Sequence, residues 1–273
     1  MSIINTNMSS LNAQRNLTKS AGDLSTSMQR LSSGLRVNSA KDDAAGMSIA
    51  TKMDSQIRGM SQASRNANDG ISMIQTADGA LSNISDALQR MRELAVQGAN
   101  DTNGADEWAN IQTEMTALNT EIGRIASDTK FNGNALLTAT AQTKSIQVGA
   151  DAGQKIDVTF GSNTSYAALN ATAIAVTDAS TASAAITAID GALKALNTER
   201  SSLGTAQNRM GYAISNLATS IENQSAAKSR ITDTDYASET SKLSRSQILQ
   251  QAGTAMLAQA NSAPNNVMSL LRG

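Results

Sequence analysis

Few side chains in this 273-residue chain are spaced in a way that could support chemistry. Asp42 and Asp43, in the sequence AKDDAAG, form an adjacent carboxylate pair of the kind that acid–base catalysis or a metal site could use. No metal-ligand pattern surrounds them, so we expect a connector turn or a helix cap instead. The glycines of GADAG, residues 149–153, lack the strand–loop–helix context of a phosphate-binding loop and indicate a hairpin turn.

Histidine and cysteine are both absent from the chain. Their absence excludes disulfides, Cys/His zinc sites, Cys/His dyads and Ser-His-Asp triads. Glutamate, aspartate, serine and lysine remain, but the sequence gathers them into no catalytic pattern. We therefore expect no catalytic residue, no metal site and no cofactor.

The composition favours a helical rod over a compact enzyme. Aromatic residues make up 2%, and there is one proline. The formal net charge is -1, so there is no basic surplus for binding nucleic acid or an anionic membrane. A low content of large apolar residues at near-zero net charge suits helices joined by a thin seam of Ala, Leu, Ile and Met.

The sequence offers no segment that predicts a place in a membrane. No stretch is long and apolar enough to cross a bilayer. The start, MSIINTNMSSLNAQRN, lacks a basic region followed by an apolar run, so we expect no cleaved secretory signal.

Apolar residues recur in alternating steps of four and three, which is the pattern of helices packed in a coiled coil. The first helix has such a seam over residues 17–35, and the polar stretch 38–46 predicts a connector. A second helix is expected over about 48–98 and a third after Asp106, a plausible N-cap. Their seams are Leu81, Ile84, Leu88, Met91 and Ala95, then Ile111, Met115, Leu118, Ile122 and Ile125.

The pattern changes in the middle of the chain. Apolar and polar residues alternate over 144–160, which predicts a β-hairpin, and 161–183 is expected to form a loop or minimal strand. A helix of roughly 40 residues resumes near Ala182, in which Arg200 and Gln207 could fix the register. We expect a polar connector over 223–239 and a last helix with Leu249, Met256, Val267 and Leu270 on one side.

These elements predict a mainly α fold, an elongated antiparallel helical bundle or coiled coil with a small β-hairpin region. The two ends of the chain would lie side by side. The expected parts are an inner domain from 1–45 and 229–273, a core bundle from 46–143 and 182–228, and a hairpin with a short outer segment over 144–181. Because isolated helices are marginal in water, we expect the ends to be ordered mainly by other copies of the chain.

Several long stretches resemble bacterial flagellins. They are MSIINTNMSSLNAQRNL at 1–17, RLSSGLRVNSAKDDAAGMSIA at 30–50, LQRMRELAVQGANDTN at 88–103, TKFNGNALL at 129–137 and ILQQAGTAMLAQANSAPNNVMSLLRG at 248–273. They cover both terminal thirds of the chain. Compared with longer flagellins, this chain resembles a short form that lacks large outer domains.

The resemblance implies a subunit that polymerises into the extracellular filament of the bacterial flagellum for swimming motility. It implies export without a cleaved signal peptide and several protein partners, namely the flagellar export apparatus, a cap protein, a chaperone of the C-terminal helix and hook-associated proteins. The expected assembly seam pairs the two terminal helices through Leu17, Leu24, Met28, Leu31, Leu35, Leu249, Met256, Val267 and Leu270. The alternative is an ordinary seam between two helices of one chain.

In the flagellin family, the stretch matching LQRMRELAVQ is bound by the Toll-like receptor that senses flagellin. Carried over by residue, this implicates Arg90, Leu94 and Glu114, with Gln89, Arg92, Glu93 and Gln97 around them. From the helical spacing, Leu94 is expected outside the core or on its flank. The same residues could instead form contacts between subunits, or a plain solvated face.

Three other functions compete with a filament subunit. The hook–filament junction protein shares the terminal helices, but TKFNGNALL and LQRMRELAVQ favour flagellin proper. A cytoplasmic signalling coiled coil would also be rich in Ala, Ser and Gln, but it would not end in the sequence found at 248–273. An enzyme is the weakest alternative, since no constellation of reactive groups supports it.

Overall fold

The computed structural model describes residues 6–137, 141–161 and 174–272, with the backbone alone for 263–272. The helices are α1 (Met8–Ser33), α2 (Ala44–Gly98), α3 (Ala105–Asp128), α4 (Ala179–Thr232) and α5 (Tyr236–Arg272). The strands β1 (Lys130–Phe131), β2 (Asn134–Ala135), β3 (Gln142–Gln147) and β4 (Lys155–Phe160) form two antiparallel pairs. The expected mainly α class with a small hairpin region is confirmed. None of the described helices is both long and apolar enough to span a bilayer.

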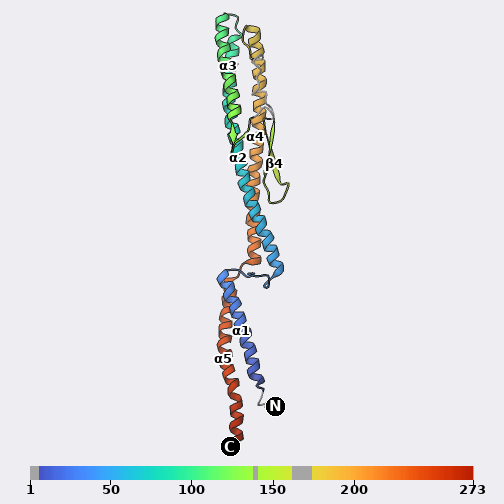
Figure 1. Cartoon of the computed structure of the whole chain (residues 1–273), viewed down its shortest axis with the longest axis vertical. Helices are drawn as coiled ribbons and strands as arrows, with labels where there is room; N and C mark the ends of the chain where they lie inside the picture. Colours follow the sequence, from blue (N-terminus) through green and yellow to red (C-terminus); the bar gives the residue numbers. More distant parts are fainter. Residues whose placement is uncertain (1–5, 138–140, 162–173, 273) are drawn as a thin grey trace. The chain divides into compact units, whose positions relative to one another are not determined.

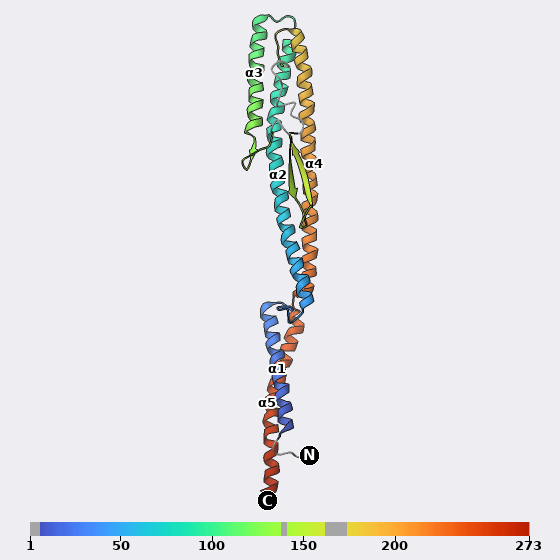
Figure 2. The same ribbon diagram turned by 45° about the vertical axis from the view of Figure 1, so that its right-hand side comes forward.

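The chain divides into two compact units. The terminal unit comprises Met1–Ser55 and Asn223–Gly273, and the central unit comprises Gln56–Glu222. Within the terminal unit, α1 and α5 lie side by side (Figures 1 and 2). The limits that we expected for the inner domain, residues 45 and 229, both lie inside the terminal unit.

The core of the central unit lies between α2, α3 and α4. The four-and-three spacing of α2 is confirmed, because its seam residues are fully buried: Leu81, Ile84, Leu88, Met91 and Ala95. The facing residues are Ile111, Met115 and Ile122 from α3 and Ile189, Leu196, Leu203 and Met210 from α4. Burial of each large apolar side chain contributes about 1.5–3 kcal/mol, so this seam dominates the stability of the unit.

Ion pairs between α2 and α4 follow the antiparallel register of the two helices. Arg200 Nε donates to Asp78 at 2.7 Å, and Arg92 Nε donates to Asp190 at 2.6 Å. Going from Asp78 to Arg92 along α2, the paired residue on α4 moves back from Arg200 to Asp190, as expected for antiparallel helices. Arg200, which the sequence marked as a polar member of the seam, therefore contacts the neighbouring helix from the flank.

The hairpin of β3 and β4 packs on the central unit and confirms the predicted hairpin (Figure 2). Ile156, Val158 and Phe160 alternate inward and are buried. Gly70 of α2 allows close contact, because a β-carbon there would lie 3.3 Å from Ile146 of β3. The buried Glu199 of α4 accepts a hydrogen bond from the Gly161 N–H at 2.9 Å, which holds the end of β4.

Paired connectors join the helices of the terminal unit. α1 ends at Gly34, whose φ of 71° is left-handed and whose N–H donates to the Arg30 carbonyl at 2.9 Å. Leu35 then pairs with Asp233 in an antiparallel bridge. Asp235 begins α5 by accepting from the N–H of Ala237 at 3.0 Å.

Three local predictions need correction. The expected connector over 223–239 is mostly helix, because α4 continues to Thr232 with Lys228 paired to Asp54 of α2. The N-cap of α3 is Gly104 rather than Asp106, with the Glu107 carboxylate accepting from the Gly104 N–H at 2.9 Å. Most of the expected loop at 161–183 lies outside the described residues, and α4 already begins at Ala179.

Candidate functional site

The face that α1 and α5 share contains fewer large apolar side chains than a typical coiled coil. Leu17, Leu24 and Leu31 of α1 are half-buried on it, as the seam predicted. Leu17 lies against Gly253, where an added β-carbon would be 3.1 Å from Leu17 Cδ1. The half-buried or buried positions of α5 follow the same spacing and are Glu239, Leu243, Ser246, Gln250, Gly253, Leu257 and Ala260. We call these seven residues the inner stripe.

The buried side chains of this pair, among the residues whose side chains are described, are all polar. They are Ser10 and Ser27 of α1 and Glu239 and Ser246 of α5. Ser27 Oγ donates to Glu239 Oε1 at 2.8 Å, and Ser10 Oγ donates to Asn261 Oδ1 at 2.7 Å. These two contacts lie toward opposite ends of the helix pair, so together they define its register.

The environment of Glu239 favours its ionised form. Burial alone would raise the pKa of the Glu239 carboxyl. The hydrogen bond from Ser27 and the ion pair with Lys242, whose Nζ is 3.1 Å from Oε2, together with the more distant charge of Arg30, outweigh burial. The pKa of Glu239 therefore lies below its usual value.

Several predicted seam residues do not meet across the pair. Met28, Leu249 and Met256 are 58%, 51% and 65% exposed, so they face away from the partner helix of the same chain. Leu35 lies beyond the end of α1 in the connector bridge. The side chains of Val267 and Leu270 lie outside the described residues. Met28, Leu249 and Met256 therefore do not form the ordinary seam within one chain that was the alternative, and their part in assembly between copies stays a prediction.

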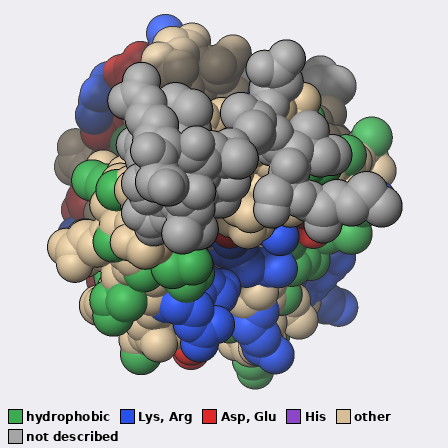
Figure 3. Space-filling view, turned by 90° about the horizontal axis from the view of Figure 1, so that it is seen from below, with side chains coloured by type: hydrophobic (Ala, Val, Ile, Leu, Met, Phe, Trp, Pro, Cys, Tyr) green, Lys and Arg blue, Asp and Glu red, His purple; other side chains and the backbone are tan. Residues whose placement is uncertain are grey.

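We call Leu249, Ala252 and Met256 the outer stripe; all three are exposed, and each precedes an inner-stripe residue by one position. Basic residues outnumber acidic residues on the two helices of the pair. α1 and α5 together contain six Lys or Arg residues and two Asp or Glu residues. Seen from below, Lys and Arg side chains gather on the molecule beside hydrophobic ones (Figure 3). The outer stripe is thus an apolar strip on a positively charged helix pair.

A second candidate surface is formed by the exposed side of α2 and α3 in the central unit. Gln89, Arg90, Arg92, Glu93, Gln97 and Glu114 are all exposed. Arg90 donates to Glu114 of α3 at 2.9 Å and to Glu93 at 3.1 Å. The hydrogen bond to Glu114 is the main cause that raises the pKa of Arg90, and Glu93 adds to it.

The predicted position of Leu94 is wrong. Its side chain is 3% exposed and belongs to the core cluster of the central unit. The reason is that α2 contacts two helices: Arg90 reaches α3 and Arg92 reaches α4. A helix between two partners buries a wider face than a single seam, and Leu94 lies on the added width.

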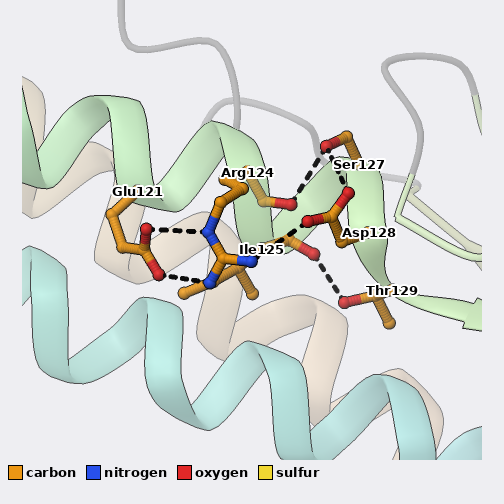
Figure 4. A network of polar contacts seen from close by, with 6 residues as sticks. All are labelled: Glu121, Arg124, Ile125, Ser127, Asp128 and Thr129. Atoms are coloured by element: carbon orange, nitrogen blue, oxygen red, sulfur yellow. Dashed lines mark hydrogen bonds and ion pairs between the residues drawn. The ribbon is translucent and has the colours of Figure 1, made fainter.

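Lower on α3, Arg124 makes ion pairs within its own helix (Figure 4). It donates to Glu121 at 2.6 Å and to Asp128 at 3.0 Å, and the bond from Arg124 lowers the pKa of Glu121. Thr129 Oγ1 donates to the Ile125 carbonyl at 2.6 Å, which closes the end of the helix. Arg124 therefore stabilises the end of α3, whereas Arg90 joins two helices.

Comparison with known proteins identifies the family. A family model described as the bacterial flagellin N-terminal helical region matches residues 4–142, and a model of the bacterial flagellin C-terminal helical region matches residues 186–271. The chain belongs to the bacterial flagellins. Both surfaces described above lie largely within these matched regions.

Curated flagellins align over nearly the full chain. The chain is 47% identical to a flagellin of Halalkalibacterium halodurans, with 99% of this chain and 100% of the relative covered. It is 42% identical to the flagellar filament 33 kDa core protein of Treponema phagedenis, with 99% and 100% covered. These relatives are similar in length to this chain, which agrees with the expected short form.

Solved structures give the same fold. The crystal structure of Bacillus cereus flagellin has a TM-score of 0.50 and 34% identity, covering 60% of this chain and 94% of that chain. A flagellar hook-associated protein from Vibrio parahaemolyticus has a TM-score of 0.60 at 14% identity, covering 70% and 100%, and shows the fold alone. The flagellins are structural proteins, and this chain is a structural subunit of the extracellular flagellar filament.

Proposed function

We propose that this flagellin polymerises for swimming motility through its α1/α5 helix pairs, with the outer stripe of α5 buried against neighbouring copies. One observation supports this most directly: the described buried side chains of the pair are polar, whereas Leu249 and Met256 are exposed. An exposed apolar strip on a helix pair marks an interaction surface. In a filament of identical subunits, the partner is another copy of the same chain.

The energetics of the helix pair favour the same proposal. Two helices gain little stability from half-buried leucines alone, because ordering their backbones costs about 1–2 kcal/mol per residue. The central unit, by contrast, has its own apolar core. We expect the terminal unit to be weakly ordered in the free subunit and to become ordered when neighbouring copies cover its apolar surface.

Seeded elongation tests this proposal. Purified chain is mixed with short flagellar fragments, and filaments are observed by electron microscopy. Leu31→Asp should block elongation, because it places a charge on the half-buried face of α1. Gln29→Asp introduces the same charge at an exposed position of the same helix and should elongate normally. Normal elongation of the Leu31→Asp chain would contradict the proposal.

The same assay separates a filament subunit from the hook–filament junction protein. A filament subunit adds many copies to a seed and yields long filaments of uniform diameter. A junction protein binds the seed without continued elongation. The 42% identity to a filament core protein supports the filament subunit.

We also propose recognition by the Toll-like receptor that senses flagellin, through the exposed side of α2 and α3. The supporting observation is that Arg90 and Glu114 are exposed and joined to each other, so they present a fixed charged pair. An arginine fixed in this way suits an interface hot spot. Because Leu94 is buried, it would contribute by stabilising α2 rather than by contacting the receptor. Receptor reporter cells should respond less to Arg90→Ala than to Arg124→Ala, and an equal response would contradict recognition at this site.

For export, we propose that the subunit leaves the cell without a cleaved signal peptide through the flagellar export apparatus. A cytoplasmic chaperone would cover the outer stripe of α5 before export, and the cap and hook-associated proteins would be its partners at the filament. The exposure of Leu249 and Met256 supports a chaperone, since such a strip would otherwise associate in the cytoplasm. Mass spectrometry of the mature subunit, with its first residues retained, tests the absence of cleavage.

A further inference from the structure

Helix α5 carries two stripes with apolar residues, and the inner stripe faces α1. Between 249 and 257 the outer stripe supplies Leu249, Ala252 and Met256, whereas the inner stripe supplies Gln250, Gly253 and Leu257. The stripes are one residue apart, so a rotation of α5 by about 100° would exchange them. Over the whole helix the inner stripe also contains Leu243 and Ala260, so apolar burial does not distinguish the two rotations, and another interaction must select the observed one.

Polar contacts toward both ends of the pair select the observed rotation. Ser27 donates to Glu239 at 2.8 Å, and both side chains are buried. Near the other end, Ser10 donates to Asn261 at 2.7 Å, and Asn7 Nδ2 donates to the Ala260 carbonyl at 2.7 Å. A hydrogen bond to an ionised group is stronger than a neutral one, so the contact at Glu239 carries the largest share.

The exchanged rotation would also bring a cation inward. Arg245 is exposed and lies one position before the buried Ser246, so the rotation would turn Arg245 toward α1. The part of α1 that Arg245 would approach lies between Leu17 and Ser27 and contains the acidic Asp23 and the basic Lys19. Moving the Arg245 guanidinium from water toward the helix interface would remove part of its hydration, which is costly.

We propose that Glu239, held by Ser27, sets the rotation of α5 on α1 and thereby keeps the outer stripe turned away from α1. The contact between Ser10 and Asn261 assists at the other end. The outer stripe then remains available to neighbouring copies instead of being consumed within one chain. This inference rests on the proposed assembly, because it assigns the residues that present the assembly surface.

Disulfide trapping in assembled filaments tests the proposal, since the chain has no cysteine of its own. The reporter of the observed rotation is Leu17→Cys with Gly253→Cys. A β-carbon on Gly253 lies 3.9 Å from Leu17 Cβ, within the range for a disulfide. The reporter of the exchanged rotation is Leu17→Cys with Ala252→Cys. Gel mobility separates a bond within one chain from a bond between copies.

Each cysteine pair is placed in the parent chain, in Glu239→Ala and in Glu239→Gln. In the parent, the pair at 253 should oxidise at least about tenfold faster than the pair at 252. Glu239→Ala should lower this ratio by roughly tenfold or more, which is the size that a charged hydrogen bond implies. Glu239→Gln keeps an acceptor for Ser27 and should retain most of the preference.

An unchanged ratio in Glu239→Ala would overturn the proposal. If that chain does not elongate by itself, it is added as a minor, tagged component to parent filaments, and the same ratio is measured on the tagged chain. Failure of the parent chain to elongate on seeds would instead refute the proposed function. The two failures are therefore distinguishable.

Discussion

Truncation of Leu249 and Met256 to alanine should weaken filament assembly without unfolding the central unit. Both side chains belong to the outer stripe of α5 and contact no core of their own chain. The buried residues of the two apolar clusters of the central unit are others, all between 60 and 217. The double variant therefore separates the stability of the subunit from that of the contact between subunits.

The exposed fractions give the expected size of the effect. Full burial of a leucine or methionine side chain contributes about 1.5–3 kcal/mol. Leu249 is 51% exposed and Met256 is 65% exposed, so about half and two thirds of this burial remain to be gained on assembly. The two truncations together should cost about 2–3 kcal/mol, which corresponds to a roughly 30- to 150-fold rise in critical concentration.

The critical concentration is measured by sedimenting filaments grown on seeds and assaying the subunit left in solution. The matched control is Gln247→Ala with Gln251→Ala, two exposed positions of the same helix that lie away from the outer stripe. The control should change the critical concentration only slightly, and thermal unfolding of the central unit should be the same in all three chains. A double variant with the critical concentration of its control would refute the assignment of the outer stripe to subunit contacts.

Three further predictions follow from the structure. Leu94→Ala should lower the free energy of unfolding of the central unit by about 2–5 kcal/mol in denaturant titrations, whereas Arg90→Ala should barely change it; the opposite order would contradict the burial of Leu94. Trypsin should cut the free subunit within 1–55 and 223–273 and leave a resistant fragment close to Gln56–Glu222, and equal resistance throughout would contradict weakly ordered ends. Because the pKa of Glu239 is lowered, its contribution to the α1/α5 pair is present above the ordinary glutamate pKa and is lost as the pH falls through the lowered value. The dissociation of parent filaments on acidification should therefore include a step that Glu239→Gln filaments lack, and identical pH profiles would count against a role for the charge.

Much of the central unit was predictable from periodicity. The seam of Leu81, Ile84, Leu88 and Met91 followed the four-and-three spacing and is fully buried. The alternation over 144–160 predicted the hairpin in the same way. Such patterns succeed where apolar burial is the dominant force, because the period alone then identifies the buried face.

The rotation of α5 was not predictable from the same patterns. Counting apolar residues placed Leu249 and Met256 on the seam of α5, but it could not tell whether that seam faces α1 of the same chain or another copy. The pairing of Ser27 with Glu239 joins residues 212 positions apart, and no local signal identifies it. The sequence of α5 alone does not show that Glu239 is buried, because its hydrogen-bond partner lies on α1.

The predictions for Leu94 and for the connector at 223–239 were wrong for other reasons. A single apolar seam is expected for a helix that packs on one other helix. Helix α2 contacts both α3 and α4, so it buries a wider face that includes Leu94. Residues 223–232 continue α4, and within this stretch Lys228 contacts Asp54 of α2. In both places, tertiary contacts outweigh the local pattern.

A helical reconstruction of the assembled filament by electron cryomicroscopy tests the central claim most directly. The account predicts that Leu249 and Met256 contact neighbouring copies, while Ser27 and Glu239 of the same chain remain hydrogen-bonded. A reconstruction in which Leu249 and Met256 pack on α1 of their own chain, or lie in contact with solvent, would contradict it.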